Sequence, residues 1–403
     1  MFIFLRAAFL AGALLATGSA VNAEPIALPD ALKKASDSSP RISQAKAQAE
    51  AAEARARQAG VSPNPELGLE IENFGGSGPY RDFRSSETTL ALSQRIELGG
   101  KRGARVAVAA AERDFALLAY KRAFADLERD VRIAHAELRA AEDRAVLARD
   151  ATGSAQELAR TAGILVDAGR DPPLRQLRAE AVLAEAKAEQ ARTFGQLLTA
   201  RRLLSSLIGS SDSELMAVAV SDEIAPANLP ADTVTLDEQL AVAERETAQA
   251  RVRVAKADAV PDVTASGGVR RFGEGRETAV VAGVSIALPF RDRNRGNIEA
   301  AQSDSLASEA SLALARLDAD RARYDARMML GAAEVRYEAL AGPGIAQAEE
   351  ALRLARIGYN AGKFSLLELL DAQSALNTAK LTLIEARLDR ARALAALTRA
   401  NAQ

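Results

Sequence analysis

The sequence predicts a mostly α-helical chain with a small transmembrane β part, built from two copies of one structural unit. Aromatic residues make up 4% of the 403 residues, and Ala, Glu, Arg and Leu are abundant, which is typical of long helices rather than a bulky globular core. A glycine turn between helical segments occurs at Gly169 and again at Gly362, an offset of 193 residues. Four short segments of alternating apolar residues account for the β part.

The first 23 residues have the pattern of a secretory signal peptide. Arg6 supplies the positive charge, the apolar run after it is too short to span a bilayer, and Val21 and Ala23 have the small side chains of a cleavage site. We expect an exported chain that begins at Glu24; an N-terminal membrane anchor is the alternative. No later segment holds the roughly 18 consecutive apolar residues of a spanning helix, so any membrane spanning falls to strands.

The first unit is expected to cover residues 24–208. Its predicted elements are, in chain order, a helix over 28–59 broken at Pro40, a strand hairpin over 65–98, a long helix from 101 to about 167, a turn over 168–173 and a helix over 174–208. The proline-rich segment 63–65 ends the first helix, because proline lacks a backbone donor.

The long helix of the first unit carries a coiled-coil seam. Apolar residues recur at alternating spacings of three and four: Leu117, Tyr120, Phe124, Leu127, Val131, Ala134, Leu138 and Ala141. At about 1.5 Å per residue, a continuous helix would be on the order of 100 Å long. The sequence leaves open whether Thr152-Gly153-Ser154 interrupts it.

The second unit is expected to cover residues 235–403, after a linker over 209–234. Its predicted elements are a helix over 235–259, a strand hairpin over 262–288, a long helix from 295 to 359, a turn over 361–365 and a final helix from 365 to about 400. Gly362 ends one helix in the left-handed conformation, and Ser365 with Glu368 forms a capping box for the next.

The strands have roughly the length that crosses a membrane at a tilt. Four strands cannot close a barrel, and an open sheet edge in lipid leaves backbone groups unpaired at several kcal/mol each. Two copies would give 8 strands with a filled interior, and three would give 12 strands with an open lumen, which favours a homotrimer. The alternative is a pair of hairpins in a soluble sheet, but the thin helices leave the apolar strand faces no other partner.

With the apolar faces toward lipid, charged residues of the opposite face would line the barrel lumen. These residues are Glu66, Glu70, Glu72, Arg95, Glu97 and Arg270. The excess of acids predicts a mild cation preference or none, and a solvated polar face would explain the same residues.

Several classes of function are not indicated by the residues present. The chain has no Cys and one His, His135, so no metal site or cofactor is expected. No nucleophile motif, phosphate-binding loop or dinucleotide fingerprint occurs, so no enzyme is expected. The formal net charge of −2 gives no basic surface, so nucleic acid is not an expected partner.

The order of elements, with YNAGKFS at 359–365 and LLDAQ at 369–373, resembles the TolC-like outer-membrane efflux proteins over nearly all of the expected mature chain. The segment SQRIELGGKR at 93–102 is similar to the heavy-metal, CzcC-like branch of that family. The resemblance implies a trimer with a 12-stranded barrel in outer-membrane lipid and a helical tunnel across the periplasm. It also implies two protein partners: a periplasmic membrane-fusion adaptor and an inner-membrane pump of the resistance-nodulation-division (RND) type.

The resemblance also assigns roles to residues of the two turns. The adaptor-docking tip turns would contain Gly169, Arg170, Gly362, Lys363 and Ser365, and the periplasmic gate would contain Glu368 and Asp371. Phe364 stands where one relative has an arginine of the gating network, so that latch is not implied here. In a trimer six carboxylates would gather around one axis, where like charges repel; the alternative is that they only favour the helix N-terminus.

The function implied is a passive exit duct for divalent heavy-metal cations such as cobalt, zinc or cadmium. A duct for drugs or for type I protein secretion is one alternative. A periplasmic coiled-coil adaptor or scaffold is another, although an adaptor would usually contain a small barrel domain of short strands, where this chain has two hairpins.

Overall fold

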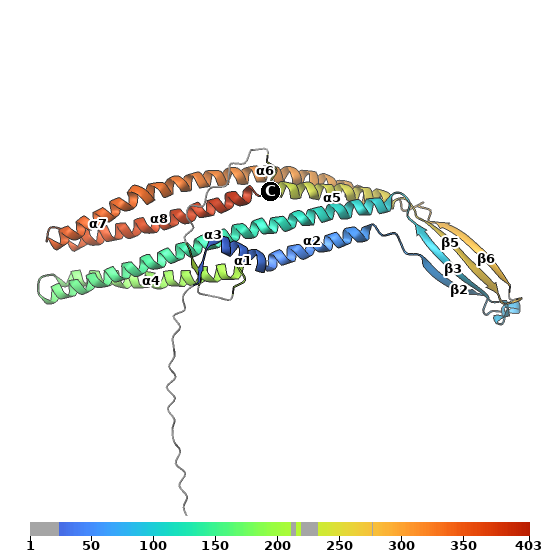
Figure 1. The fold of residues 1–403 in the computed structure, drawn as a ribbon, viewed down its shortest axis with the longest axis horizontal. Helices are drawn as coiled ribbons and strands as arrows, with labels where there is room; N and C mark the ends of the chain where they lie inside the picture. Colours follow the sequence, from blue (N-terminus) through green and yellow to red (C-terminus); the bar gives the residue numbers. More distant parts are fainter. Residues whose placement is uncertain (1–23, 211–214, 219–232, 276) are drawn as a thin grey trace, which may run out of the picture.

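A computed structural model describes residues 24–210, 215–218, 233–275 and 277–403; the expected signal peptide lies outside these residues. The molecule is long and thin, with a β-sheet at one end and two helix hairpins at the other (Figure 1). Within the described ranges, no helix is both long and apolar enough to cross a membrane.

The helices of the first unit follow the expected order. They are α1 (Leu28–Ser38), α2 (Pro40–Ala59), α3 (Lys101–Asp167) and α4 (Pro173–Leu207). Ser39 separates α1 from α2, and Pro40 occupies the first position of α2, where its missing N–H costs no hydrogen bond. The expected break at Pro40 is therefore present.

The helix α3 is continuous through Thr152. The Thr152 hydroxyl donates to the Ala148 carbonyl at 2.9 Å within α3 and lies 3.1 Å from the Ala186 carbonyl of α4, so it joins the two helices. The predicted seam is buried from Leu127 onward and packs on α1 and α4. The prediction of a packed seam is wrong at its first residue, because the Leu117 side chain is 46% exposed.

The helices of the second unit are α5 (Leu236–Asp258), α6 (Arg295–Ala339), α7 (Ile345–Asn360) and α8 (Leu366–Ala400). The expected long helix from 295 to 359 is helical throughout, but a π-helical segment, η3 (Leu340–Gly344), divides it into α6 and α7. Pro343 lies inside this segment, and its lack of an N–H and its ring disrupt the regular α-helical ladder.

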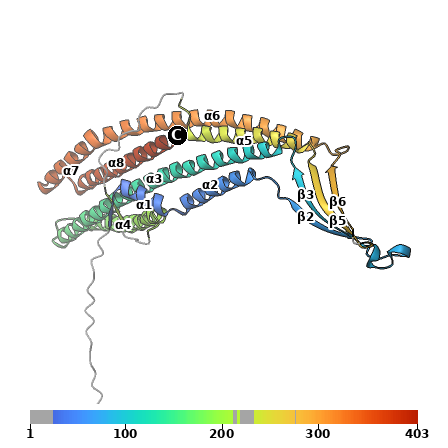
Figure 2. The same cartoon turned by 45° about the vertical axis from the view of Figure 1, so that its right-hand side comes forward.

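Four strands form one antiparallel sheet in the order β2-β3-β5-β6. They are β2 (Glu66–Glu72), β3 (Glu87–Ile96), β5 (Val263–Phe272) and β6 (Thr278–Ile286). Two short 3₁₀ turns, η1 (Gly78–Tyr80) and η2 (Phe83–Ser85), lie in the loop between β2 and β3. Figure 2 shows the sheet extending away from the helices, with this loop at its far end.

The register of the sheet separates an apolar face from a polar one. Leu69, Leu90, Val269 and Val280 form one row of directly paired residues across all four strands. The adjacent row, Glu70, Thr89, Arg270 and Ala279, points to the opposite face. Apolar side chains of the first face are exposed, Leu67 by 71% and Val280 by 86%, so this face has no partner among the residues that the structure describes.

A second, two-stranded sheet was not expected from the sequence. In it, β1 (Glu24–Ile26) pairs in parallel with β4 (Leu215–Ala217), which lies in the predicted linker. Side chains of α3 hold both strands: His135 Nε2 lies 3.1 Å from the Ile26 carbonyl oxygen, and Glu142 accepts from the Ala217 N–H at 3.0 Å. The linker is therefore partly structured, and the described ranges contain six strands rather than four.

Candidate functional site

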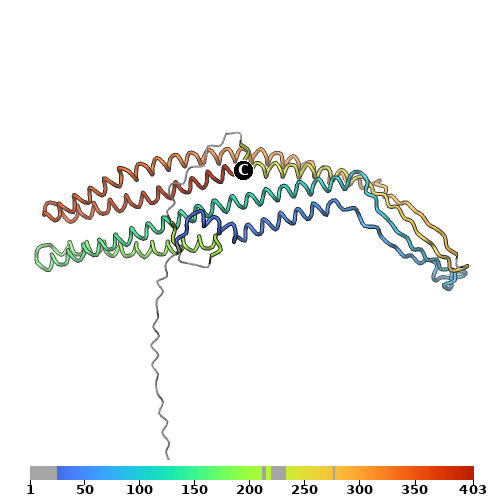
Figure 3. The backbone as a smooth tube through the Cα atoms, in the orientation of Figure 1, coloured from blue at the N-terminus to red at the C-terminus, as the bar shows by residue number. Residues whose placement is uncertain are grey.

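The two tip turns lie at the same end of the molecule, opposite the sheet (Figures 1 and 3). In the first turn, the Gly169 N–H donates to the Val166 carbonyl and the Arg170 N–H to the Leu165 carbonyl, both at 2.9 Å. Gly169 has φ +68°, the left-handed conformation that closes a Schellman motif. Gly169 and Arg170 are both exposed.

The second turn repeats these hydrogen bonds 193 residues later. The Gly362 N–H donates to the Tyr359 carbonyl at 3.0 Å, and the Lys363 N–H donates to the Gly358 carbonyl at 2.9 Å. Gly362 has φ +69°, and it is exposed together with Lys363 and Ser365. The two predicted turns therefore have the same backbone geometry.

The residues that start the following helices differ between the turns. Pro172 precedes α4 in extended conformation, and Asp171 pairs with Arg175. At the start of α8, the Glu368 N–H donates to Ser365 Oγ at 3.3 Å and the Ser365 N–H donates to Glu368 Oε2 at 2.6 Å. This confirms the predicted capping box.

The two acids assigned to the gate lie on the exposed side of α8. Glu368 and Asp371 are both exposed, whereas Leu366, which precedes them, and Leu369, which lies between them, are buried. The hydrogen bonds from the backbone and side chain of Ser365 lower the pKa of Glu368. Glu368 thus stays ionised while it caps the helix, and the Asp371 carboxylate is presented to the surface one turn further along.

A cavity of ≈ 880 Å³ lies between the α3–α4 and α7–α8 hairpins near these turns. Three ion pairs join α3 to α8 on the side nearer the sheet: Asp126–Arg399, Glu137–Arg392 at 2.7 Å and Asp143–Arg387 at 3.2 Å. Along α3 the cavity begins at Arg144, directly after the last pair, and extends to Thr161. The hairpins are therefore joined by ion pairs at mid-length, and toward their tips the cavity lies between them while Leu158 of α3 still packs against Leu352 and Leu369 of the other hairpin.

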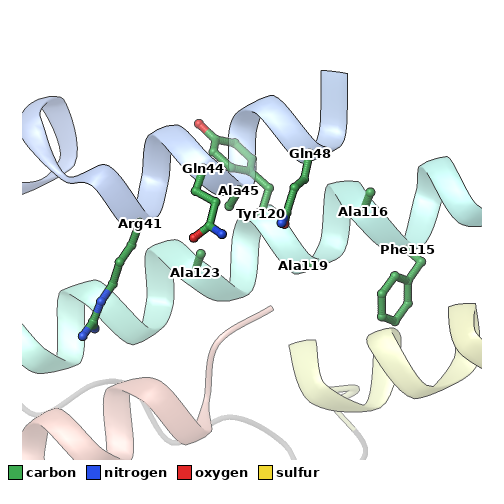
Figure 4. A pocket seen from close by; sticks show the side chains of 9 residues that line it. All are labelled: Arg41, Gln44, Ala45, Gln48, Phe115, Ala116, Ala119, Tyr120 and Ala123. Carbon is green, nitrogen blue, oxygen red and sulfur yellow. The ribbon is translucent and has the colours of Figure 1, made fainter. Parts of the chain in front are cut away.

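A smaller pocket of ≈ 340 Å³ lies between α2 and α3, closer to the sheet. Figure 4 shows Arg41, Gln44 and Gln48 on α2 and Phe115 and Tyr120 on α3 around it. Arg41 forms an ion pair with Asp130 of α3 at 3.1 Å, so its charge already has a partner that joins α2 to α3.

Charged residues cluster at the loop end of the polar sheet face. Arg270 Nη2 lies 3.1 Å from Glu72 Oε2, Arg270 Nη1 donates to Glu87 Oε2 at 2.8 Å, and Arg270 Nε donates to Thr89 Oγ1 at 3.0 Å. Glu87 was not among the residues predicted to line the lumen, although it lies within the predicted hairpin over 65–98. Its position could have been predicted from the alternation of side chains, because Glu87 is an even number of residues from Thr89 and Arg95 and so lies on the same face of the strand.

Other residues assigned to the lumen are dispersed. Glu66 and Glu70 are exposed on β2, and Arg95 is exposed near the helix end of β3. The placement of Glu97 in a strand is wrong, because β3 ends at Ile96. Glu97 Oε2 instead accepts from Arg105 Nη2 of α3 at 3.0 Å.

The junction between sheet and helices is fixed by polar contacts. Lys101 Nζ at the start of α3 donates to Asp262 Oδ1 at 2.7 Å, and Asp262 also accepts from the Leu98 N–H at 3.3 Å. Gly99 has φ +67°, and a Cβ there would overlap Val260, so the chain turns here only with glycine.

No cluster of three or more His, Cys, Asp or Glu side chains able to hold a metal occurs among the described residues.

The profile of the family described as "Outer membrane efflux protein" matches residues 31–210 and 237–403. The chain belongs to this family. It is therefore an outer-membrane efflux protein, which confirms the expected family and location.

Two relatives from Cupriavidus metallidurans add detail to this assignment. The chain is 30% identical to the cobalt-zinc-cadmium resistance protein CzcC over 89% of its own length and 86% of the relative's. It is 36% identical to the nickel and cobalt resistance protein CnrC over 79% and 78% of the two chains. The efflux family and the similarity to the heavy-metal branch are thus both confirmed.

The fold is also that of a solved outer-membrane protein. VceC from Vibrio cholerae matches with a TM-score of 0.78 and 22% identity, covering 93% of this chain and 96% of VceC. The mostly helical, TolC-like architecture expected from the sequence is therefore confirmed for the single chain.

Proposed function

We propose that three copies of this chain form the outer-membrane exit duct of a tripartite RND-type system that exports divalent heavy-metal cations such as cobalt, zinc or cadmium. The observation that carries the cargo is the identity of 30% to CzcC and 36% to CnrC, two proteins whose names share cobalt resistance. The duct is passive, carries out no reaction and holds no cofactor; the partner pump supplies the energy.

The sheet supports closure by three chains. Its edge strands β2 and β6 have one neighbour each, and unpaired backbone groups in lipid cost several kcal/mol apiece. Pairing β6 of one chain with β2 of the next satisfies both edges, and three four-stranded sheets give a 12-stranded barrel. The exposed apolar face then contacts lipid. The polar face lines the lumen with Glu66, Glu70, Glu72, Glu87, Arg95 and Arg270.

The tip turns are the proposed contact with the periplasmic adaptor. Gly169 and Arg170 on one hairpin and Gly362, Lys363 and Ser365 on the other are exposed at the end farthest from the sheet. In a trimer these turns form a ring that alternates two chemistries. Arg170 and Lys363 place a cation at the same position of both turns, which suits acidic or carbonyl groups of a partner hairpin.

Glu368 and Asp371 are the proposed periplasmic gate. Both carboxylates are exposed on α8 close to the tip, and threefold symmetry brings six of them around the tunnel axis. Their repulsion favours a bound cation or an opening motion of the tip. The duct would then narrow at the end where cargo enters.

We also propose that residues 24–208 and 235–403 arose by duplication, with 209–234 as the connection and 1–23 as a cleaved signal. The equal hydrogen bonds of the two turns and the two segments matched by the family profile support this arrangement.

Deletion of the gene tests the cargo. Cells that lack this chain should become sensitive to cobalt, zinc or cadmium and should accumulate these metals, and a plasmid copy should restore both. Sensitivity confined to organic drugs would assign the duct to another cargo, and loss of a secreted protein without metal sensitivity would indicate type I secretion.

A further inference from the structure

Arg270 occupies an unusual position on the polar face of the sheet. Glu72 of β2 and Glu87 of β3 are directly paired residues, and like charges in such a pair destabilise a sheet. Arg270 reaches across from β5 and binds both carboxylates, with its two terminal nitrogens at 3.1 and 2.8 Å. One guanidinium therefore compensates two acids on two neighbouring strands.

The cluster is partly shielded and fixed in place. The Arg270 side chain is 31% exposed and the Glu87 side chain 23%, so screening by solvent is weaker than at an open surface. The bond from Arg270 Nε to Thr89 Oγ1, its directly paired residue, fixes the guanidinium along β3. These contacts hold the Arg270 guanidinium close to the polar face of the sheet.

The cluster also lies at a defined depth. Glu72 ends β2 and Glu87 begins β3, so the cluster borders the loop at the end of the molecule farthest from the helix tips (Figure 1). Cargo that enters the proposed duct at the helix tips would pass this cluster last.

We propose that Arg270 determines the ion selectivity of the exit by neutralising part of a ring of six carboxylates from Glu72 and Glu87. This inference rests on the proposed trimeric pore with the polar face inside. A conducting path must bind ions weakly enough to release them. A ring of six uncompensated carboxylates would attract and retain divalent cations at the outlet, and three guanidinium groups reduce this retention.

Arg271 provides a matched control. It is the next residue on β5, carries the same charge and is exposed, but it points to the opposite, apolar face. Arg270→Gln and Arg271→Gln therefore make the same change in net charge on opposite sides of the wall.

The test is planar-bilayer recording of the full-length variants in a potassium chloride gradient. Arg270→Gln should raise the cation-over-anion permeability ratio by about twofold or more, and added zinc should block its current more strongly than that of the unmodified protein. Arg271→Gln should leave both values unchanged. Equal permeability ratios and equal zinc block for Arg270→Gln and the unmodified protein would overturn the inference.

Two further variants separate charge from folding. Glu87→Gln removes one acid and should move the permeability ratio in the opposite direction, and it remains informative if Arg270→Gln does not assemble. Glu87→Gln combined with Arg270→Gln restores the original net charge and should restore the original ratio. No current from the unmodified protein would reject the proposed pore, whereas conduction without these shifts would reject only the role of Arg270.

Discussion

The aromatic ring of Phe364 lies directly over Gly358 in the second tip turn, where a Cβ atom on residue 358 would overlap the ring. Gly358 is buried at the end of α7, and its carbonyl accepts from the N–H groups of both Lys363 and Phe364. The ring thus packs directly against the backbone of the second turn. The first turn lacks such a ring; there Pro172 precedes α4 and Asp171 pairs with Arg175.

Gly358→Ala should therefore displace the Phe364 ring. We expect a destabilisation of about 1–3 kcal/mol from overpacking, read from the denaturation midpoint, together with weaker metal export. Phe364→Ala added to Gly358→Ala should recover most of the loss. The control is Gly163→Ala on α3, where a Cβ would meet only the Gln176 side chain at 3.8 Å and should be tolerated. Equal effects of the two alanines would contradict the packing argument.

Gly362→Val should impair coupling to the pump while the trimer still forms. A β-branched residue resists the left-handed conformation that Gly362 adopts, at a cost of about 1–2 kcal/mol. The measurement is metal export in cells together with the oligomeric state of the extracted protein. Gly362→Asn, which tolerates this conformation, is the control. Loss of the trimer in the valine variant would show that the turn is required for assembly.

Glu368→Ala combined with Asp371→Ala should raise single-channel conductance, because the change removes the carboxylates proposed to narrow the entrance. Glu368→Gln and Asp371→Asn keep the side-chain size and separate charge from volume. The glutamine also retains an oxygen acceptor for the Ser365 N–H, so the cap is largely preserved. Conductance equal to that of the unmodified protein in all three variants would reject the gate assignment.

Asp237 and Arg399 should make stability depend on pH in the acid range. Arg399 binds Asp237 through two nitrogens at 2.9 and 3.1 Å and so joins the end of α8 to the start of α5. Burial alone would raise the pKa of Asp237, but the hydrogen bond and charge of Arg399, with the charge of Arg122, outweigh burial and lower it. The stabilisation is therefore present above the unfolded-state pKa of about 3.9 and is lost as pH falls through the folded value.

The measurement for this pair is the urea midpoint between about pH 2 and pH 6. Asp237→Asn should lower the midpoint at pH 6 and flatten its fall toward acid. Asp320→Asn, an exposed carboxylate on α6, is the matched control and should change neither. An unchanged acid profile in Asp237→Asn would contradict the role of this ion pair.

The elements that could be predicted from the sequence are those fixed by local patterns. Gly169 and Gly362 end helices because of their own backbone freedom, and Ser365 with Glu368 caps α8 through residues three apart. The alternation in β2 and β5 likewise predicted which side chains share a face. These features need no knowledge of distant contacts.

The features that were missed depend on distant partners or on competing local signals. Leu215–Ala217 forms β4 only because Ile26 and the side chains of α3 lie beside it, and three residues carry no strand pattern of their own. The π-helical segment η3 was not predicted, although Pro343, which lies inside it, is a residue that disrupts the α-helical ladder. The contact of Arg270 with Glu72 joins strands about 200 residues apart in the sequence. It could be predicted only if the order in which the four strands pair was already known.

The trimeric barrel in the outer membrane is the central claim, and extraction followed by native mass spectrometry tests it most directly. The protein should resist a high-salt wash of isolated membranes, dissolve only in detergent and give the mass of three chains, with gel mobility that changes on heating. Release by salt alone, or a monomer in detergent under conditions that preserve other barrels, would contradict the claim and favour a periplasmic scaffold.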